Sequence, residues 1–173
     1  MGAVRKIKLS GDNNLSTIVD EEDYQTLRLW DYKWRPVIRR FTTYAVAHKN
    51  NQEIRLHRLI MGLLDAPRSD IVDHIDHNGL NNSRTNLRIT NKNGNAQNRR
   101  KLLSKKCSSS YKGVCYKLSH NKTNPWYASI RLPDGGKSKH LGYYRTETEA
   151  ARSYNEAAIK YYGTMAYLNE LPD

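Results

Sequence analysis

Short stretches in which hydrophobic and polar residues alternate are frequent in the first half of the chain, and this pattern is typical of strands with one face in water. Residues 4–9 alternate apolar and basic side chains, and residues 41–48 (FTTYAVAH) are rich in strand-forming residues, so we expect a strand at each. Two short helices are expected as well. Residues 21–29 include an acidic cluster, which complements the dipole at a helix start, and residues 57–64 carry apolar side chains on one side.

A strand, a loop, a second strand and a helix are expected in that order between residues 71 and 98. Two β-branched residues precede Asp73 and His74, and an Asn-Gly turn signal follows them. Residues 87–90 (LRIT) alternate again, and the polar residues after them can cap a helix that carries Asn95. In this arrangement the side chains of Asp73, His74 and Asn95 can converge, although 22 residues separate Asp73 from Asn95.

The side chains of this stretch suit phosphodiester hydrolysis. Its 28 residues include two aspartates, two histidines and eight asparagines. A hard divalent cation prefers oxygen ligands and keeps several waters, and Asp73 and Asn95 supply two such ligands. His74 can accept a proton from water near neutral pH, and Asn86 could orient His74 through its amide. The reaction needs such a base for the attacking water and a cation for the charge that develops on the phosphate.

The spacing of these residues resembles a known nuclease motif. The sequence VDHIDHNGLNNSRTNLR, with NAQN behind it, contains Asp73-His74, then Asn86 twelve residues after the histidine and Asn95 nine residues further on. This pattern is similar to the ββα-metal motif of HNH homing endonucleases of phages and introns. The resemblance implies that Asp73 and Asn95 bind one Mg²⁺ or Mn²⁺ ion. It also implies that His74 is the general base and that Asn86 positions the base or the scissile phosphate.

Three histidines of the first half have other interpretations. His77 stands where a glycine is common in the relatives, and its role stays open. His74 and His77 have HxxH spacing, but Cys107 and Cys115 lie far away and no CxxC exists, which argues against a structural zinc site. His57 lies at the start of a predicted helix, where a lone histidine is more often a packing or capping residue than a catalyst.

Residues 99–110 (RRKLLSKKCSSS) are expected to form a linker. Five positive charges and a run of serines mark an abrupt change of composition. We expect this linker to follow DNA phosphates because it would join two DNA-binding halves, and a solvated connector is the alternative. The predicted DNA contacts in it are Arg99, Arg100, Lys101, Lys105 and Lys106.

Residues 111–173 are expected to form a second domain in which three antiparallel strands pack on one helix. The predicted strands are residues 111–118, 126–132 and 137–143. A Pro-Asp-Gly-Gly hairpin signal precedes the last of them. Thr146 and Glu149 make a capping box for a helix that carries alanines and tyrosines along one stripe and ends at Gly163.

The motifs of this second domain resemble the AP2 DNA-binding domain. YKGV, WYASIR, HLGYY, TETEAARSYNEAAIKYYG and AYLNE match it across nearly all of its length. On the middle strand Tyr127, Ser129 and Arg131 would point outward, and such a sheet is the right width to enter a DNA major groove. Carried over by position, the groove-facing residues are Lys112, Cys115, Lys117, Ser129, Arg131, Ser138 and His140. Several of these positions differ in plant relatives, so the DNA sequence that those relatives bind cannot be assigned to this chain. The alternative is a small domain whose sheet binds protein instead of DNA.

The charge of the chain indicates a polyanionic partner. Its 173 residues carry a net charge of +12, and no apolar run approaches the ~20 residues of a membrane-spanning helix, so double-stranded DNA is expected rather than a membrane or a small molecule. Residues 98–173 hold 14 lysines and arginines against 6 acidic residues, whereas residues 1–97 hold 15 against 11. Two cysteines make no disulfide framework, which suits the reducing cytoplasm of a bacterial host or phage-infected cell. Charge alone does not decide whether a basic group in the first half contacts DNA or is merely solvated: Lys33, Arg35, Arg39 and Arg40.

The sequence therefore predicts an α+β protein with an HNH nuclease domain over residues 1–98, a linker over residues 99–110 and an AP2-like domain over residues 111–173. The expected activity is site-specific, metal-dependent DNA cleavage of the homing type, with one active site that nicks one strand. A monomer on DNA is expected, with a dimer as the alternative. A DNA-binding regulator with a vestigial nuclease half is the main alternative function, and an RNA-binding or RNA-cutting protein is a weaker one.

Overall fold

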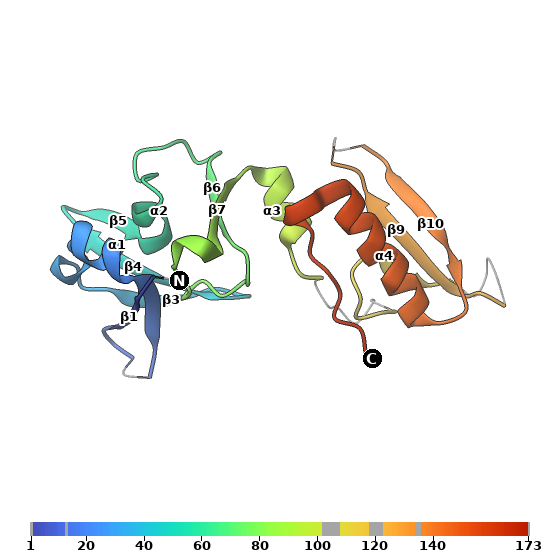
Figure 1. Ribbon diagram of the computed structural model, residues 1–173, viewed down its shortest axis with the longest axis horizontal. Helices are drawn as coiled ribbons and strands as arrows, with labels where there is room; N and C mark the ends of the chain where they lie inside the picture. Colours follow the sequence, from blue (N-terminus) through green and yellow to red (C-terminus); the bar gives the residue numbers. More distant parts are fainter. Residues whose placement is uncertain (1, 13, 102–107, 118–122, 134–135, 173) are drawn as a thin grey trace. The chain divides into compact units, whose positions relative to one another are not determined.

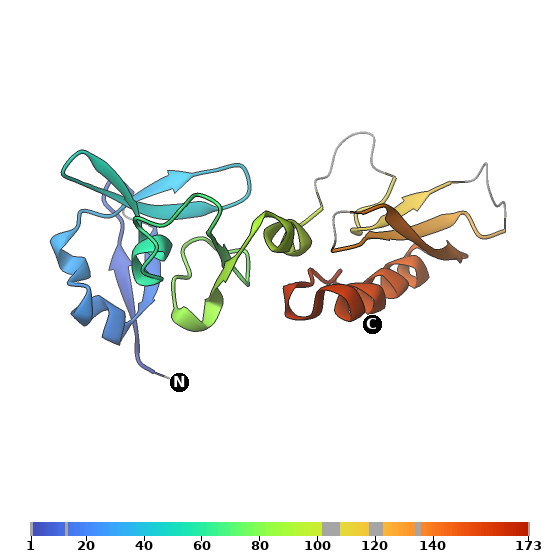
Figure 2. The same cartoon turned by 90° about the horizontal axis from the view of Figure 1, so that it is seen from above.

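The computed structural model describes residues 2–12, 14–101, 108–117, 123–133 and 136–172. The chain divides into two compact units, Met1–Asn91 and Lys92–Asp173, whose elements are shown in Figures 1 and 2. Each unit mixes short antiparallel strands with a few helices, so the predicted α+β class is confirmed. In the described ranges, no helix has the length and apolar character needed to cross a membrane.

Three small antiparallel sheets build the first unit. β1 (Val4–Lys8) pairs with β2 (Ser16–Asp20). The second sheet has the strand order β3-β4-β5, made of Arg35–Ile38, Thr43–Lys49 and Gln52–Arg55. The third is a hairpin of β6 (Ile71–His74) and β7 (Leu87–Thr90). The short helices of this unit are α1 (Glu21–Thr26), the 3-10 turn η1 (Leu29–Asp31), α2 (Leu56–Ile60) and the 3-10 turn η2 (Arg84–Asn86).

Both predicted helices of the first unit are shorter than the sequence pattern indicates. The helix predicted over residues 21–29 is interrupted, because Arg28 adopts a left-handed backbone with φ 48° between α1 and η1. The helix predicted over residues 57–64 ends at Ile60, and Gly62 follows with φ 68°, a conformation that commonly terminates helices. In both segments the apolar pattern of the sequence extends beyond the last residue of the helix.

The core of the first unit gathers apolar side chains from all three sheets. Trp34 is buried, and its Nε1 donates to the Leu29 carbonyl at 2.9 Å, so the one polar atom of this large side chain is satisfied. The other buried residues of this core cluster are Leu9, Val19, Leu29, Ala45, Ala47, Ile54, Leu56, Ile60, Val72 and Leu87. Val72 and Leu87 belong to β6 and β7, and they anchor that hairpin to the core.

β2 supports the long loop between β6 and β7. Ile18 forms a parallel bridge with Asn81. The Ile18 N–H donates to the Leu80 carbonyl and the Ile18 carbonyl accepts from the Asn82 N–H, both at 2.8 Å. A strand far away in the sequence thus gives this loop a fixed backbone path.

The second unit begins with α3 (Lys92–Asn98) and continues into a three-stranded antiparallel sheet covered by α4 (Glu147–Tyr162). The strand order is β10-β9-β8, made of Ser138–Tyr144, Trp126–Arg131 and Val114–Tyr116. Both hydrogen bonds of the predicted capping box between Thr146 and Glu149 are present, and α4 ends at Gly163, as expected. The 3-10 turn η3 (Gly163–Met165) follows.

α4 packs on the sheet through small side chains. Its buried residues are Ala150, Ala151, Tyr154, Ala157 and Ala158. Ala128 and Ile130 of β9 are buried as well and lie on the face toward α4. Because side chains alternate along a strand, Tyr127, Ser129 and Arg131 point to the opposite face.

The division between the two units falls at Asn91, seven residues before the predicted end of the nuclease domain at residue 98. α3 belongs to the second unit, where the Tyr167 N–H donates to the Gln97 carbonyl at 3.4 Å. Asn95 lies on α3 and is therefore part of the second unit.

Candidate active site and nucleic-acid interface

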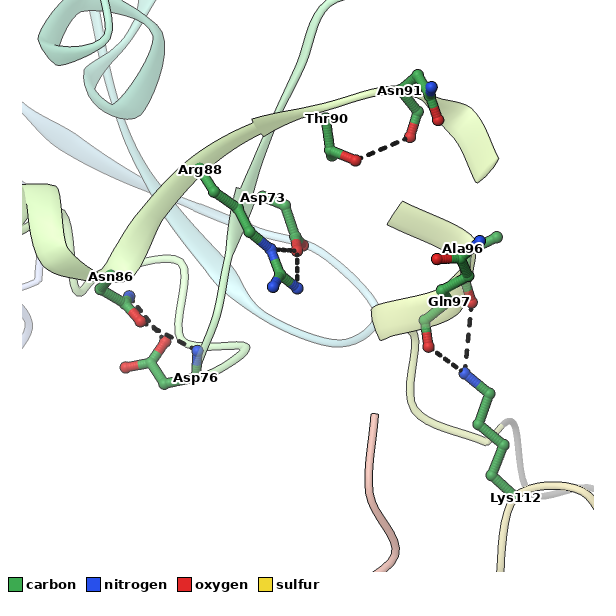
Figure 3. A network of polar contacts seen from close by, with 9 residues as sticks. All are labelled: Asp73, Asp76, Asn86, Arg88, Thr90, Asn91, Ala96, Gln97 and Lys112. Carbon is green, nitrogen blue, oxygen red and sulfur yellow. Dashed lines mark hydrogen bonds and ion pairs between the residues drawn. The ribbon is translucent and has the colours of Figure 1, made fainter. Parts of the chain in front are cut away.

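Asp73 and His74 end strand β6, and both are buried, with 8% and 6% of their surface exposed. Asp73 lies opposite Arg88 of β7. Nε and Nη2 of Arg88 donate to Oδ2 of Asp73 at 2.9 and 2.8 Å (Figure 3). A carboxylate in such a position needs a partner, because a desolvated unpaired charge is costly. The predicted metal ligand is therefore already held by an ion pair that sequence reasoning missed.

Asn82 holds the imidazole of His74 in one orientation. His74 Nε2 lies 3.2 Å from Asn82 Oδ1, and Asn82 is fully buried. The same amide donates through Nδ2 to Thr17 Oγ1 and to the Gly79 carbonyl, at 2.8 and 3.3 Å. A carbonyl can only accept, so the Gly79 contact identifies Nδ2 as the donor end of the amide and Oδ1 as the acceptor end. Neutral His74 therefore carries its proton on Nε2, and Nδ1 is the nitrogen that accepts a proton.

Two further rings pack against His74. The ring centroids of Tyr44 and His57 lie 5.8 and 5.2 Å from that of His74. Burial lowers the pKa of His74 below its usual value, although the hydrogen bond to Asn82 acts in the opposite direction. Burial, together with the neighbouring His74, lowers the pKa of His57 to about 3. His57 is therefore neutral at physiological pH, and its Nδ1 has no hydrogen-bond partner among the described residues.

Asn86 shapes the loop that precedes β7. Its Oδ1 accepts from the Asp76 N–H at 3.0 Å, and its Nδ2 donates to Asp76 Oδ1 at 2.9 Å (Figure 3). Nδ2 also donates to the Asn81 carbonyl at 2.7 Å. Burial acts to raise the pKa of Asp76, but backbone and asparagine hydrogen bonds outweigh it and lower that pKa. Asn82, which the loop turns into the interior, contacts the His74 imidazole. The role expected for Asn86, to position the base or the scissile phosphate, stays a prediction.

His77 has a left-handed backbone, with φ 63°. This conformation favours glycine, because a side chain is strained there. The His77 N–H donates to the His74 carbonyl at 3.1 Å and so closes a turn directly after β6.

Asn95, the second predicted metal ligand, is half-buried on α3 in the second unit. Joint metal binding by Asp73 and Asn95 therefore stays a prediction. The donor types fit Mg²⁺ or Mn²⁺, because a carboxylate and a carboxamide are hard oxygen ligands and such ions keep water in their other positions. No cluster of three or more histidine, cysteine, aspartate or glutamate side chains that could hold a metal ion occurs in the described part of the chain.

Most of the predicted DNA contacts lie together on the outer face of the sheet in the second unit. By strand register and ring contacts this face carries Cys115, Lys117, Tyr127, Ser129, Arg131, Ser138 and His140. The Tyr127 ring stacks on His140 with centroids 4.8 Å apart, and Lys117 Nζ lies 4.0 Å from the Tyr127 centroid. Tyr143 joins this cluster, with its ring 5.0 Å from that of His140. Sequence reasoning missed Tyr143, although it follows the predicted β10 pattern.

Two lysines predicted to bind DNA donate instead to backbone carbonyls within the second unit. Lys112 Nζ lies 2.6 to 3.4 Å from three carbonyls at and just after the end of α3 (Figure 3 shows the first two), those of Ala96, Gln97 and Arg99. The last carbonyls of a helix have no partner within it, so this ammonium group caps α3. Burial lowers the pKa of Lys112 to about 8. Lys101 Nζ likewise donates to two carbonyls, at 2.8 and 2.9 Å.

The remaining predicted linker contacts divide into two groups. Arg99 and Arg100 are exposed. Lys105 and Lys106 lie outside the described residues, as does Cys107.

Comparison with known proteins identifies two kinds of relative, an HNH endonuclease and plant transcription factors, as the sequence motifs led us to expect. The chain is 35% identical over 122 residues to an uncharacterized HNH endonuclease of Acanthamoeba polyphaga mimivirus, a match that covers 69% of the chain and 59% of that protein. It is 43% identical over 63 residues to dehydration-responsive element-binding protein 2C of Arabidopsis thaliana, which covers 35% of the chain and 18% of that protein. It is 40% identical over 62 residues to the AP2-like ethylene-responsive transcription factor ANT of the same plant, which covers 36% of the chain and 11% of that protein.

The chain is a homologue of an HNH endonuclease and of AP2-domain transcription factors. The HNH and AP2 combination expected from the sequence motifs is thereby confirmed. This HNH–AP2 homologue spans less than two thirds of the length of each of these relatives. No family model and no solved structure matches it.

Proposed function

We propose that this HNH–AP2 homologue is a site-specific DNA endonuclease of the homing type, in which the first unit cuts the duplex and the second unit binds it. The observation that carries the proposal is the imidazole of His74, which the buried amide of Asn82 holds next to Asp73 at the end of β6. An imidazole with a fixed tautomer beside a hard oxygen ligand suits metal-assisted phosphodiester hydrolysis. Homology to an HNH endonuclease supports the same activity.

The proposal extends to the two folds. β6, β7 and α3 follow one another as the two strands and helix of a ββα-metal motif would. β8, β9, β10 and α4 follow the order of an AP2 domain, with three antiparallel strands and one capped helix. The element order and the capping box support both assignments.

In the proposed reaction, His74 Nδ1 accepts a proton from a water molecule while the water oxygen attacks phosphorus in line with the 3′ oxygen. The new P–O bond forms as the bond to the 3′ oxygen breaks, and that oxygen takes a proton from solvent, which leaves 5′ phosphate and 3′ hydroxyl ends. Asp73 and Asn95 would hold a Mg²⁺ or Mn²⁺ ion, which would supply positive charge for the phosphate and the departing oxygen. Asn82 determines which nitrogen of His74 accepts the proton from water, because it keeps the proton of the neutral imidazole on Nε2.

DNA binding is assigned to the outer face of the β8-β9-β10 sheet. Arg131 is exposed there, and Lys117, Tyr127 and His140 form a continuous cationic and aromatic surface beside it. Arginine and lysine on such a face bind phosphates and guanine edges in a major groove. One active site in each chain implies that a monomer nicks one strand, and the setting we propose is the cytoplasm of a bacterial or phage-infected cell.

The decisive experiment measures how fast the purified chain relaxes supercoiled plasmid, once with Mg²⁺ and once with EDTA. We expect relaxation that requires the metal and falls at least about a hundredfold in His74→Gln, because glutamine can still donate to Asn82 but cannot take up the proton. His48→Gln is the matched control, since His48 is an exposed histidine of the same unit. Metal-independent relaxation, or equal rates for His74→Gln and the unmodified chain, would contradict the proposal.

The homology to plant transcription factors favours a second candidate, a DNA-binding regulator whose nuclease half is inactive. A regulator would retard duplex DNA in a gel but would relax no plasmid with Mg²⁺ or Mn²⁺. The same preparation in both assays therefore separates the two functions.

A further inference from the structure

The turn between β3 and β4 exposes two large apolar side chains beside two cations. Ile38 is 73% exposed and Phe41 is 60% exposed, and Arg39 and Arg40 stand between them and are exposed too. We call residues 38–41 the β3–β4 tip. Exposed apolar side chains that lie together beside polar or charged ones are typical of interaction sites.

In their ion pairing, the two arginines of the tip differ from half of the ten arginines of the first unit. Five arginines of that unit form ion pairs with carboxylates, namely Arg5, Arg28, Arg55, Arg84 and Arg88. Within the described residues, Arg39 and Arg40 make no such pair. The Arg40 guanidinium lies over the Phe41 ring, 5.1 Å from its centroid. The tip therefore presents two positive charges that no acidic side chain of the described chain neutralises.

The residues directly after the tip, Thr42 to Tyr44, contact the loop after β6 and the ring of His74. Thr42 Oγ1 accepts from the N–H of Gly79, in the loop after β6, at 2.7 Å. A Cβ on Gly79 would stand 2.5 Å from the Thr43 carbonyl and 2.8 Å from the Tyr44 ring, so loop and strand are in close contact. The Tyr44 ring in turn packs against His74. Figure 1 shows the β3–β4 turn beside this loop.

We propose that the β3–β4 tip contacts duplex DNA next to the scissile phosphate, which is attacked by the water that His74 deprotonates. Arg39 and Arg40 bind phosphates, and Phe41 enters between two base pairs with Ile38 beside it. Basic side chains next to an apolar wedge suit this task, because the cations bind the backbone while the wedge unstacks and bends the duplex. A bend at the cut would bring the scissile phosphate toward the buried His74. This inference rests on the proposed endonuclease function.

The salt dependence of DNA binding tests the two arginines. Each phosphate contact adds about 0.9 to the slope of log binding constant against log salt, so Arg39→Ser with Arg40→Ser should lower that slope by about 1.8. Between about 50 and 200 mM salt, the unmodified chain should then lose about tenfold more affinity than the variant. Lys6→Ser with Lys8→Ser is the matched control, since it removes two exposed positive charges from β1 of the same unit. Equal slopes for the tip variant and the unmodified chain would overturn the phosphate contacts.

Fluorescence of 2-aminopurine tests the wedge. The probe is placed at the base step beside the mapped cut, and a His74→Gln background keeps the DNA intact. We expect fluorescence to rise when this chain binds, and the rise to disappear with Phe41→Ser but to persist with Val4→Ser, a control that removes another exposed apolar side chain. An unchanged rise with Phe41→Ser would overturn the wedge. If the unmodified chain neither binds nor cuts DNA, the endonuclease proposal fails; if it does both and the tip variants match it, only the tip proposal fails.

Discussion

Arg88 places two nitrogens, Nε and Nη2, on a single oxygen of Asp73. The two residues face each other across β6 and β7, and their side chains are only 15% and 9% exposed. The proposed metal ligand is therefore oriented by its strand partner before any cation arrives. A pair of this kind is strongly coupled to folding, because each charge depends on the other for its stability in the interior.

Removing the guanidinium should therefore destabilise the first unit. We expect Arg88→Met to lower the free energy of unfolding by about 3 kcal/mol, since it removes the positive charge and the two hydrogen bonds that Arg88 gives to a buried carboxylate. Urea denaturation measures the change. Arg55→Met serves as the control, because the Arg55–Glu53 pair is exposed on both sides and should cost less than about 1 kcal/mol. Equal losses in the two variants would show that the buried pair has no special role.

Asn82 should control cleavage without touching the substrate. Asn82→Ala removes the acceptor of His74 Nε2 and the donor to Thr17, and we expect cleavage to fall about 10- to 100-fold, as for other residues that orient a reactive imidazole. Asn82→Asp keeps an acceptor for Nε2 and adds a negative charge, which favours the protonated ring and raises the pKa of His74. The acid limb of the pH–rate profile should then move to higher pH. A profile that stays in place would mean that Asn82 does not face the acting imidazole.

Acid should destabilise the first unit through His57. The pKa of His57 is about 3 in the folded chain against an ordinary value of 6.5. The unfolded chain therefore takes up this proton first as the pH falls, so the stability that neutral His57 contributes is complete above pH 6.5 and is lost below it. We expect the free energy of unfolding to fall by about 1.4 kcal/mol per pH unit below that point.

Replacing the ring isolates this effect. His57→Phe keeps an aromatic side chain against Tyr44 and His74 but cannot take up a proton, so urea denaturation series should show a flatter pH dependence. His48→Phe should leave the dependence unchanged, because His48 is exposed. If both variants keep the slope of the unmodified chain, the acid sensitivity has another origin.

Loss of the positive charge should affect stability at Lys112 and DNA binding at Arg131. Lys112→Met removes the cap from α3 and should lower stability, with little change in the salt dependence of DNA binding, because its ammonium group already binds three carbonyls. Arg131→Met should leave stability almost unchanged and lower the salt slope by about 0.9, the effect of one phosphate contact. Thermal melts and DNA titrations at several salt concentrations measure both. If Lys112→Met lowers the salt slope and leaves stability unchanged, Lys112 contacts DNA and its cap on α3 has little effect on stability.

Local sequence signals predicted the second unit well. The capping box of Thr146 and Glu149 and the alternation along β9 each depend on residues within a few positions of one another, so the pattern alone determined α4 and the outward face of Tyr127, Ser129 and Arg131. The motif of the first unit likewise singled out Asp73, His74 and Asn86, and their functional roles stay predictions; the structure shows that Asp73 and His74 end β6 and that all three residues are buried.

Only the tertiary structure decided how these side chains are held. The partner of His74 is Asn82, whose position depends on β2 and on Thr17, 65 residues away in the chain. The ion pair of Arg88 follows from strand register, and the cap that Lys112 places on α3 follows from packing within the second unit. A sequence pattern shows which groups are available and which face of an element they occupy. Which donor meets which acceptor depends on contacts between distant segments, and those exist only once the chain has folded.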